Sequence, residues 1–300
     1  MGRKVNVLGV GMVKFAKPGA SDGYEVMANG AIKEALKDAG VEWAKVEQAY
    51  AGYVFGDSTC GQRAVYSVGP TGIPVINVNN NCSTGSTALY LARQAIEGGL
   101  AECVLAVGFE QMQKGALAAA WNDRTNPLDQ HLNVMNAQQG VNQAPFAAQM
   151  FGGAGREYRW KYGTKRETFA KISHKARTHA AKNPYALFRE VLSVEQILAS
   201  EDVFDPLTRF QCCPPTCGAA AAILCSDEFA KKHGLSPAVR IAGQTMKTDF
   251  ASSFGDSMIK MVGFDMAKAA ATELYEKTGI GPKDVQVVEL HDCFTANELL

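Results

Sequence analysis

The chain lacks any apolar run long enough to span a bilayer, and it has no excess of charge of either sign. The first absence argues against a membrane-spanning helix. The second, thirty basic against thirty acidic side chains, leaves no global field that would favour nucleic acid or an anionic membrane. The N-terminus has no apolar signal region, and the eight cysteines are spread irregularly. We therefore expect reduced thiols in an intracellular compartment and no disulfide scaffold.

Hydrophobic residues make up 47% of the 300 residues and follow strand and helix patterns in alternation. The pattern predicts strands at 5–10, 46–55, 74–78, 102–109, 219–224 and 239–244, and helices at 24–38 and from 82 to about 98. The strands are apolar almost throughout, which predicts an α/β sheet covered by helices on both faces. Polar loops and helices such as 167–182 replace the strands from about 116 to 215. We interpret this stretch as an inserted lid.

The run Gly9-Val10-Gly11 begins like a dinucleotide-binding fingerprint. The third glycine of that fingerprint is missing, so the motif is weak evidence for a nucleotide site. We interpret these glycines as structural.

An internal repeat relates residues 31–41 to residues 270–280 at a constant offset of 239. Each copy is a helical run that stops at a glycine, Gly40 or Gly279, and is followed by an apolar run, which is 285–290 in the second copy. The gapless register favours duplication of one α/β unit, and a generic helix-turn-strand pattern is the alternative. The second copy stops early and the chain ends inside a helical run, so we expect a fragment of a longer protein.

Cys82 stands where an apolar strand ends in a polar corner and a small-residue helix begins. Unpaired backbone N–H groups and the positive end of the helix dipole favour a thiolate at such a corner, and the same N–H groups could hold an oxyanion. The alternative is a buried structural cysteine, because cysteine is among the most buried residue types. As a nucleophile, Cys82 should react with alkylating reagents faster than Cys103 or Cys225, which sit in apolar runs.

A second cluster, His291-Asp292-Cys293-Phe294, follows the predicted strand at 285–290. On an extended chain His291 and Cys293 project to the same side, at the sheet edge where ligand sites gather. If this edge faces the Cys82 corner, the site holds a nucleophile, an imidazole and a second thiol. No metal site is expected, because only two good ligands occur here and the cysteines at 212–217 have no matching second half.

The corner at 77–86, the segment at 52–63 and the His291-to-Phe294 motif together resemble the thiolase superfamily, and within it the sterol carrier protein X type of 3-ketoacyl-CoA thiolase. A Cys-Ser-x-Gly-Ser corner is shared widely among thiolases. The His-Asp-Cys-Phe motif replaces the Asn-Glu-Ala-Phe of most thiolases and is characteristic of this subgroup. The resemblance runs from about residue 5 to residue 300.

The resemblance implies a five-layered α/β/α/β/α fold of two similar halves with an inserted loop domain, the second half being incomplete in this chain. The implied domains are an N-terminal half at 1–118 and 216–262, a loop domain at 119–215, and the start of the C-terminal half at 263–300. A homodimer in the peroxisome is also implied, with no nucleic-acid partner.

The implied activity is thiolytic cleavage of 3-ketoacyl-CoA to acyl-CoA plus acetyl-CoA or propanoyl-CoA, in β-oxidation of fatty acids or sterol side chains. Coenzyme A is the co-substrate, and no permanently bound cofactor is implied. By this likeness Cys82 carries the acyl group, His291 orients a water or the thioester oxygen, and Cys293 is the acid/base. Met150 falls where thiolases place a segment over the acyl pocket, and a plain core methionine is the alternative.

The Gly-His-Pro histidine that activates the nucleophile in such thiolases, and the Gly-rich segment that completes the oxyanion hole, do not occur in this chain. Two other functions remain open at this point. One is a condensing ketoacyl synthase, although a second thiol beside His291 argues against it. The other is a non-catalytic acyl- or sterol-binding module, against which the retention of Cys82, His291 and Cys293 argues.

Overall fold

The computed structural model describes residues 2–113 and 121–300. The chain divides into two compact units. The first unit is Met1–Ala116 with Pro215–Met246, and the second is Leu117–Pro214 with Lys247–Leu300. The predicted boundary at 118/119 lies outside the described residues, and the three-part division expected from the sequence stays a prediction.

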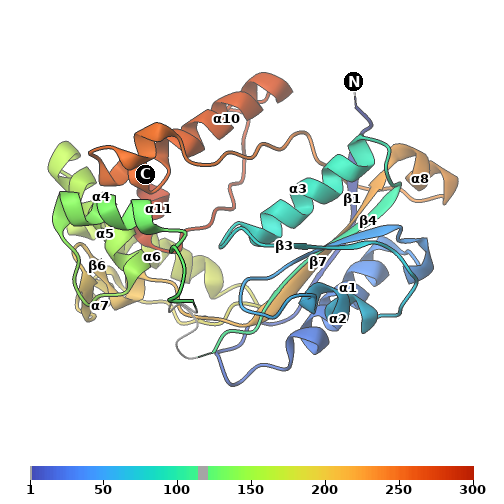
Figure 1. The fold of residues 1–300 in the computed structure, drawn as a ribbon, viewed down its shortest axis with the longest axis horizontal. Helices are drawn as coiled ribbons and strands as arrows, with labels where there is room; N and C mark the ends of the chain where they lie inside the picture. The colour runs from blue at the N-terminus through green and yellow to red at the C-terminus, as the bar shows by residue number, and fades with distance from the viewer. Residues whose placement is uncertain (1, 114–120) are drawn as a thin grey trace. The chain divides into compact units, whose positions relative to one another are not determined.

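A six-stranded mixed sheet forms the centre of the first unit, in the order β3-β2-β4-β7-β1-β8 (Figure 1). The strands are β1 (Val5–Met12), β2 (Gln48–Gly52), β3 (Val75–Val78), β4 (Cys103–Glu110), β7 (Gly218–Ser226) and β8 (Val239–Arg240). β2 runs parallel to β3 and β4, whereas β7 lies antiparallel between β4 and β1. All six strands predicted for this unit are confirmed, with shorter bounds at β2 and β8.

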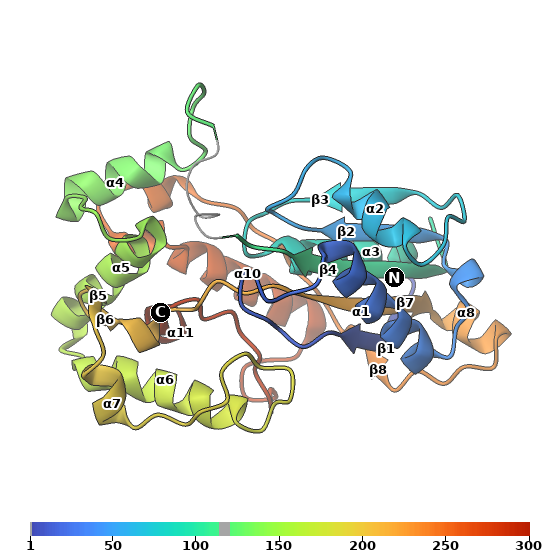
Figure 2. The ribbon, with the colours of Figure 1, turned by 90° about the horizontal axis from the view of Figure 1, so that it is seen from below.

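Helices cover both faces of this sheet (Figure 1, Figure 2). The helices of the unit are α1 (Tyr24–Ala39), α2 (Cys60–Tyr66), α3 (Thr84–Glu97) and α8 (Asp227–Lys232), with a 3-10 turn at Trp43–Lys45. One apolar core lies under α1, α2 and α8, and a second lies between α3 and the other face. The predicted α/β sheet with two covered faces is therefore confirmed.

The glycines of β1 let α1 approach the sheet closely. A Cβ atom at Gly9 would lie 2.3 Å from the backbone nitrogen of Ala39, and one at Gly11 would lie 2.3 Å from the carbonyl oxygen of Ala31. Such distances leave no room for a side chain. The structural interpretation of Gly9-Val10-Gly11 is therefore confirmed.

Helices dominate the second unit. They are α4 (Asp129–Gln139), α5 (Phe146–Tyr162), α6 (Arg166–Ala180), α7 (Val194–Leu198), α9 (Met258–Met261), α10 (Phe264–Thr278) and α11 (Thr295–Leu299). A small hairpin of β5 (Asp202–Phe204) and β6 (Leu207–Thr208), and 3-10 turns at Arg209–Gln211 and Ala251–Phe254, complete it. The predicted helix at 167–182 is confirmed as α6, whereas the hairpin was not predicted.

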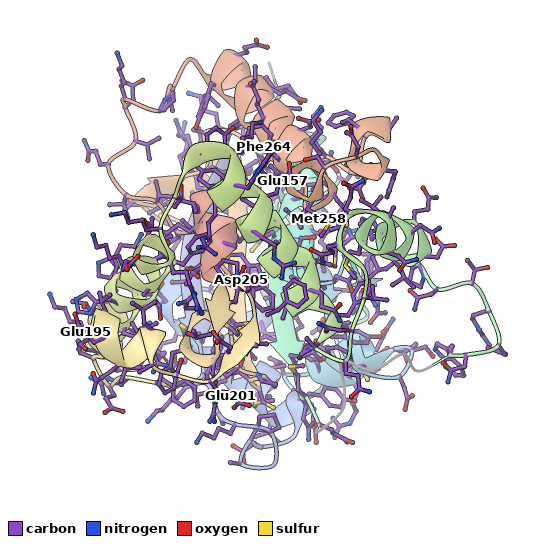
Figure 3. All side chains as sticks on the ribbon, turned by 90° about the vertical axis from the view of Figure 1, so that its left-hand side faces the viewer. Glu157, Glu195, Glu201, Asp205, Met258 and Phe264 are labelled. Carbon is purple, nitrogen blue, oxygen red and sulfur yellow. The ribbon has the colours of Figure 1, made fainter. Side chains whose placement is uncertain are left out.

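A half-buried carboxylate ties two of these helices together. Glu157 on α5 accepts hydrogen bonds from the backbone nitrogens of Met258 and Ile259, at 2.6 and 3.1 Å, and from the Ser257 hydroxyl at 2.7 Å (Figure 3). A carboxylate at the first turn of a helix satisfies its unpaired N–H groups. Glu157 thus fixes the start of α9 against α5.

The predicted strand at 285–290 is wrong. No strand forms over these residues, all of which the structure describes. Val287 and Val288 are 81% and 67% exposed, and Val285 and Leu290 are exposed as well. An extended apolar run becomes a strand only where a neighbouring backbone pairs with it, and no described strand lies beside this segment.

Candidate active site

Cys82 lies in the corner between β3 and α3, and its side chain is exposed. The corner turns at Asn81, which adopts a left-handed φ of 47°. Asparagine tolerates this conformation better than most residues. Ser83 is the N-cap position and α3 begins at Thr84, so Cys82 stands immediately before the helix. The alternative of a buried structural cysteine is therefore excluded.

Side-chain hydrogen bonds hold the backbone on both sides of Cys82. The Thr84 hydroxyl donates to the Asn81 carbonyl oxygen at 2.6 Å and accepts from the Asn80 backbone nitrogen at 2.9 Å. The Asn80 amide donates to the Thr87 hydroxyl at 3.1 Å. Because α3 is anchored on the sheet, these bonds present the thiol in one fixed place.

The start of α3 offers unsatisfied hydrogen-bond donors. No side chain of the described residues caps this helix. The Gly85 and Ser86 backbone nitrogens have no acceptor within the described ranges. A Cβ atom at Gly85 would meet no described atom within 4 Å, so the space beside the first turn is open. Two N–H groups and the positive helix end can together stabilise an oxyanion.

A glycine at the end of β2 allows α3 to begin where it does. A Cβ atom at Gly52 would lie 2.7 Å from Cγ2 and 3.0 Å from the carbonyl oxygen of Thr84. Any larger residue would push the first turn of α3 away from the sheet. Gly52 therefore helps to set the position of the Cys82 corner.

The Asn77 side chain connects the two polar segments that carry the thiolase resemblance in this unit. Its oxygen accepts from the Gly61 backbone nitrogen at 3.0 Å, and its nitrogen donates to the Gln62 side chain at 2.8 Å. The segment at 52–63 is thereby held against the segment at 77–86. Two of the three motif segments that carry the thiolase resemblance thus lie together.

Glu110 is a residue of this region that the sequence analysis missed. It ends β4, and its carboxylate accepts hydrogen bonds from the backbone nitrogens of Val54 and Phe55 at 3.0 and 3.1 Å. Burial raises the pKa of Glu110, while the backbone N–H donors oppose that rise. The carboxylate pins the loop that follows β2. The sequence signal for Glu110 was an acidic residue at the end of an otherwise apolar strand.

Cys103 and Cys225 contrast with Cys82. They lie opposite each other on β4 and β7, and both are fully buried. Burial raises the pKa of Cys103 to about 12 and that of Cys225 to about 11. Both thiols are thus shielded from solvent and hard to ionise. The predicted order of reactivity has this geometric basis and stays a prediction.

His291 and Cys293 lie in the second unit and differ in their surroundings. Cys293 is 9% exposed and belongs to an apolar core with Phe294, whose ring stacks on Phe151 at 5.3 Å. His291 is exposed, and its carbonyl oxygen accepts a hydrogen bond from the Asn297 amide. The shared side expected for His291 and Cys293 stays a prediction.

Met150 lies on α5 in the second unit. It is half-buried against a core that includes Met135, Met258 and Met261. The core-methionine alternative thus has a structural basis, and a role as pocket wall stays a prediction. Cys82 belongs to the first unit, so its joint action with residues of the second unit stays a prediction as well.

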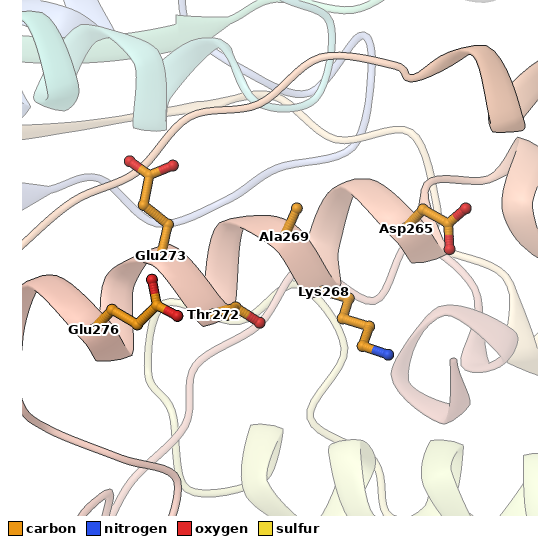
Figure 4. Close-up of a pocket in the computed structure, with 6 residues that line it drawn as sticks. All are labelled: Asp265, Lys268, Ala269, Thr272, Glu273 and Glu276. Carbon is orange, nitrogen blue, oxygen red and sulfur yellow. The ribbon is translucent and has the colours of Figure 1, made fainter.

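A shallow surface pocket of about 500 Å³ lies along α10 (Figure 4). Its lining residues are Asp265, Lys268, Ala269, Thr272, Glu273 and Glu276. None of them is a predicted site residue. In the part of the chain that the structure describes, no group of three or more His, Cys, Asp and Glu side chains could hold a metal ion. No described helix is both long and apolar enough to cross a membrane.

Comparison with known proteins identifies the family of this chain. Residues 10–228 match the model of the thiolase N-terminal domain. Sterol carrier protein 2 of Oryctolagus cuniculus is 59% identical over 99% of this chain and 55% of that protein. Non-specific lipid-transfer protein-like 2 of Caenorhabditis elegans is 44% identical over 99% of this chain and 74% of that protein. The chain spans about half the length of the first of these relatives.

A solved structure has a similar fold. Human mitochondrial 3-ketoacyl-CoA thiolase in complex with CoA superimposes with a TM-score of 0.76 at 21% identity, over 99% of this chain and 81% of that chain. The predicted thiolase fold is thereby confirmed. With the family match over residues 10–228 and the exposed cysteine at the strand-helix corner, the chain belongs to the thiolase family.

Proposed function

We propose that this chain supplies the nucleophile, Cys82, of an acyltransferase that cleaves 3-ketoacyl-coenzyme A with free coenzyme A. One observation carries the proposal. Cys82 is an exposed thiol on a hydrogen-bonded corner, and the Gly85 and Ser86 N–H groups in the first turn of the following helix have no acceptor within the described ranges. This arrangement offers a nucleophile and an oxyanion site side by side.

The reaction proceeds in two half-reactions. The Cys82 sulfur attacks the keto carbon, and the developing oxyanion is stabilised by N–H donors such as those of Gly85 and Ser86. The bond between the α and β carbons then breaks, which leaves an acyl group on Cys82 and releases the enolate of acetyl-CoA or propanoyl-CoA. In the second half-reaction the thiol of coenzyme A attacks the acyl-cysteine, and the shortened acyl-CoA leaves.

We assign proton transfer to Cys293 of the second unit. Cys293 protonates the departing enolate and later removes the proton of the coenzyme A thiol, while His291 orients a water or the thioester oxygen. Met150 borders the acyl chain. The assignment is supported by the His-Asp-Cys-Phe motif and by the buried setting of Cys293 among apolar side chains.

The substrates are lipid acyl-CoA molecules. The names of the two relatives, a sterol carrier protein and a lipid-transfer protein, support a substrate with a fatty-acyl or sterol side chain. The complex of the human thiolase with CoA supports coenzyme A as co-substrate. We further propose a homodimer that works in peroxisomal β-oxidation.

The test is steady-state thiolysis of acetoacetyl-CoA and of a longer 3-ketoacyl-CoA by the chain joined to the C-terminal segment that carries the Gly-His-Pro histidine. Cys82→Ala should abolish turnover, because the covalent step is lost. Cys293→Ala should slow turnover about a hundredfold or more and still permit acylation of Cys82, because only proton transfer is lost. Cys225→Ala, which removes a buried thiol elsewhere, should keep the wild-type rate.

Three other outcomes decide between functions. Near-wild-type turnover in Cys82→Ala overturns the proposal. Decarboxylative condensation of a malonyl thioester without thiolysis would instead identify a ketoacyl synthase. Saturable binding of acyl chains or sterols without any turnover would identify a binding module.

A further inference from the structure

Two segments of the second unit bring a pair of cysteines into register. Cys212 pairs with Phe294 in an antiparallel bridge. Beside this bridge the backbone nitrogen of Cys213 donates to the carbonyl oxygen of Cys293 at 2.8 Å. Antiparallel register therefore sets Cys213 opposite Cys293, although they are 80 positions apart in sequence.

Opposed residues of an antiparallel pair meet the backbone requirement for a disulfide. Their Cα atoms are about 4.5–5.5 Å apart and their side chains share one face. Disulfides join residues whose Cα atoms are about 4.4–6.8 Å apart. Cys213 and Cys293 therefore need no large backbone movement to be bridged.

The two thiols differ in access. Cys213 is exposed, whereas Cys293 is buried. The neighbouring Cys212 is half-buried, and its sulfur donates to the Thr208 carbonyl oxygen at 3.5 Å. Burial, with a smaller contribution from Cys213, raises the pKa of Cys212 to about 12. An oxidant from solvent therefore meets Cys213 first, because oxidation follows exposure and thiolate character.

We propose that Cys213 and Cys293 form a dithiol that a hydroperoxide converts into a reversible disulfide. Cys213 is the peroxide-reactive thiol, and Cys293 resolves the oxidised form. The ligand class is a small hydroperoxide, with hydrogen peroxide as the simplest member.

The chemistry balances in two steps. The Cys213 sulfur attacks one oxygen of hydrogen peroxide, the O–O bond breaks, and the thiol proton leaves with the second oxygen as water. The Cys293 sulfur then attacks the sulfenic sulfur of Cys213, the S–O bond breaks, and a second water carries away the Cys293 proton. The two thiols lose two electrons, which the one peroxide molecule accepts.

The consequence for activity rests on the proposed function. A disulfide removes the Cys293 thiol, to which the proposed mechanism gives both proton transfers. Oxidation would therefore stop thiolysis, and a thiol reductant would restore it. The bond itself can form whether or not Cys293 has that role.

The experiment uses the full chain and its Cys82→Ser variant, which lacks the other exposed candidate thiol. Each is treated briefly with stoichiometric hydrogen peroxide, blocked with N-ethylmaleimide, digested without reductant and mapped by mass spectrometry. We expect a cross-linked peptide pair that contains Cys213 and Cys293 and that dithiothreitol separates. Cys225→Ser should keep the cross-link, and Cys213→Ser should lose it.

The outcomes separate this proposal from the proposed function. Oxidation of Cys213 to sulfinic acid without a cross-link, or a cross-link from Cys213 to Cys212, overturns the dithiol. The same finding leaves the proposed function in place if Cys293→Ala still slows thiolysis. A Cys213–Cys293 cross-link in protein that keeps full thiolysis supports the dithiol and contradicts the acid/base role of Cys293.

Discussion

The two copies of the internal repeat fold alike through the helix and its end, and differently afterwards. α1 stops at Gly40 with φ 64°, and α10 stops at Gly279 with φ 70°. In both copies the glycine adopts the left-handed conformation that ends many helices. Beyond that point the first copy continues into β2, whereas 285–290 forms no strand although it is described throughout.

The difference lies in what surrounds each copy. α1 buries seven side chains against the sheet, among them the fully buried Ile32, whereas α10, described over its whole length, has no fully buried residue. β2 is paired on both sides, with β3 and β4. Local sequence therefore suffices for the helix and its stop, whereas the strand depends on partners elsewhere in the chain.

α10 makes ion pairs with neighbouring residues, whereas α1 packs through apolar side chains. Glu273 forms ion pairs with Lys247 and Lys277, and these pairs lower the pKa of Glu273 to about 2. Exposed ion pairs contribute little to stability. We therefore expect substitutions that remove packing to lower the free energy of unfolding more in the first copy than in the second. Substitutions that change only backbone conformation should lower it equally in both copies.

Proline should separate the two copies most strongly. The backbone nitrogen of Ala49 in β2 donates to the Pro74 carbonyl oxygen at 3.0 Å, and the repeat aligns Ala49 with Val288. Ala49→Pro removes a hydrogen bond from a central strand, so we expect a loss of about 3 kcal/mol or more in the free energy of unfolding. Val288→Pro should cost less than about 0.5 kcal/mol. Urea denaturation followed by circular dichroism measures both, and equal losses would contradict the comparison.

Truncation of a helix side chain should give the next largest difference. Leu36 on α1 lies in the core, and the repeat aligns it with the half-buried Tyr275 on α10. Leu36→Ala should lower the free energy of unfolding by about 2–4 kcal/mol, because it leaves a cavity. Tyr275→Ala should cost about 1 kcal/mol or less. The same denaturation assay applies, and a larger loss at Tyr275 would show that α10 is packed as tightly as α1.

The helix-ending glycines should show no difference. A Cβ atom at Gly40 would approach only Leu235, at 4.0 Å, and one at Gly279 would meet no described atom within 4 Å. Only the left-handed conformation therefore opposes a side chain. Gly40→Ala and Gly279→Ala should each cost about 1 kcal/mol. A clear inequality between them would mean that the two helix ends are not held alike.

The smallest effect concerns the ion pairs of α10. The folded-state pKa of Glu273 is depressed from 4.5 to about 2, so its stabilising contribution is present above about pH 4.5 and is lost as the pH falls toward 2. We expect the protection of the α10 amides, taken as the ratio of intrinsic to observed exchange rate, to fall over this window, because protonated Glu273 no longer pairs with Lys247. Glu273→Gln should remove that pH dependence, and high salt should weaken it. An unchanged exchange profile in Glu273→Gln would show that the pairs do not hold α10.

Sequence patterns predicted the features that neighbours along the chain determine. Helical periodicity and Gly40 predicted α1, and the polar corner after an apolar strand predicted that Cys82 lies between a strand and a helix. The same reasoning failed at 285–290, because strand pairing depends on residues far away in the sequence. It also missed the contact of Glu110 with Val54 and the register of Cys213 with Cys293, which arise only when distant segments come together.

The most direct test of the account is to trap the acyl group on Cys82. The chain, joined to the C-terminal segment that carries the Gly-His-Pro histidine, is mixed with acetoacetyl-CoA without free coenzyme A, quenched in acid, digested and mapped by mass spectrometry. If Cys82 is the nucleophile, one acetyl group is found on the peptide that contains Cys82, together with released acetyl-CoA, and both are lost in Cys82→Ala. Acetyl-CoA release with the acetyl group on another cysteine, or with no acetylated peptide, would contradict it.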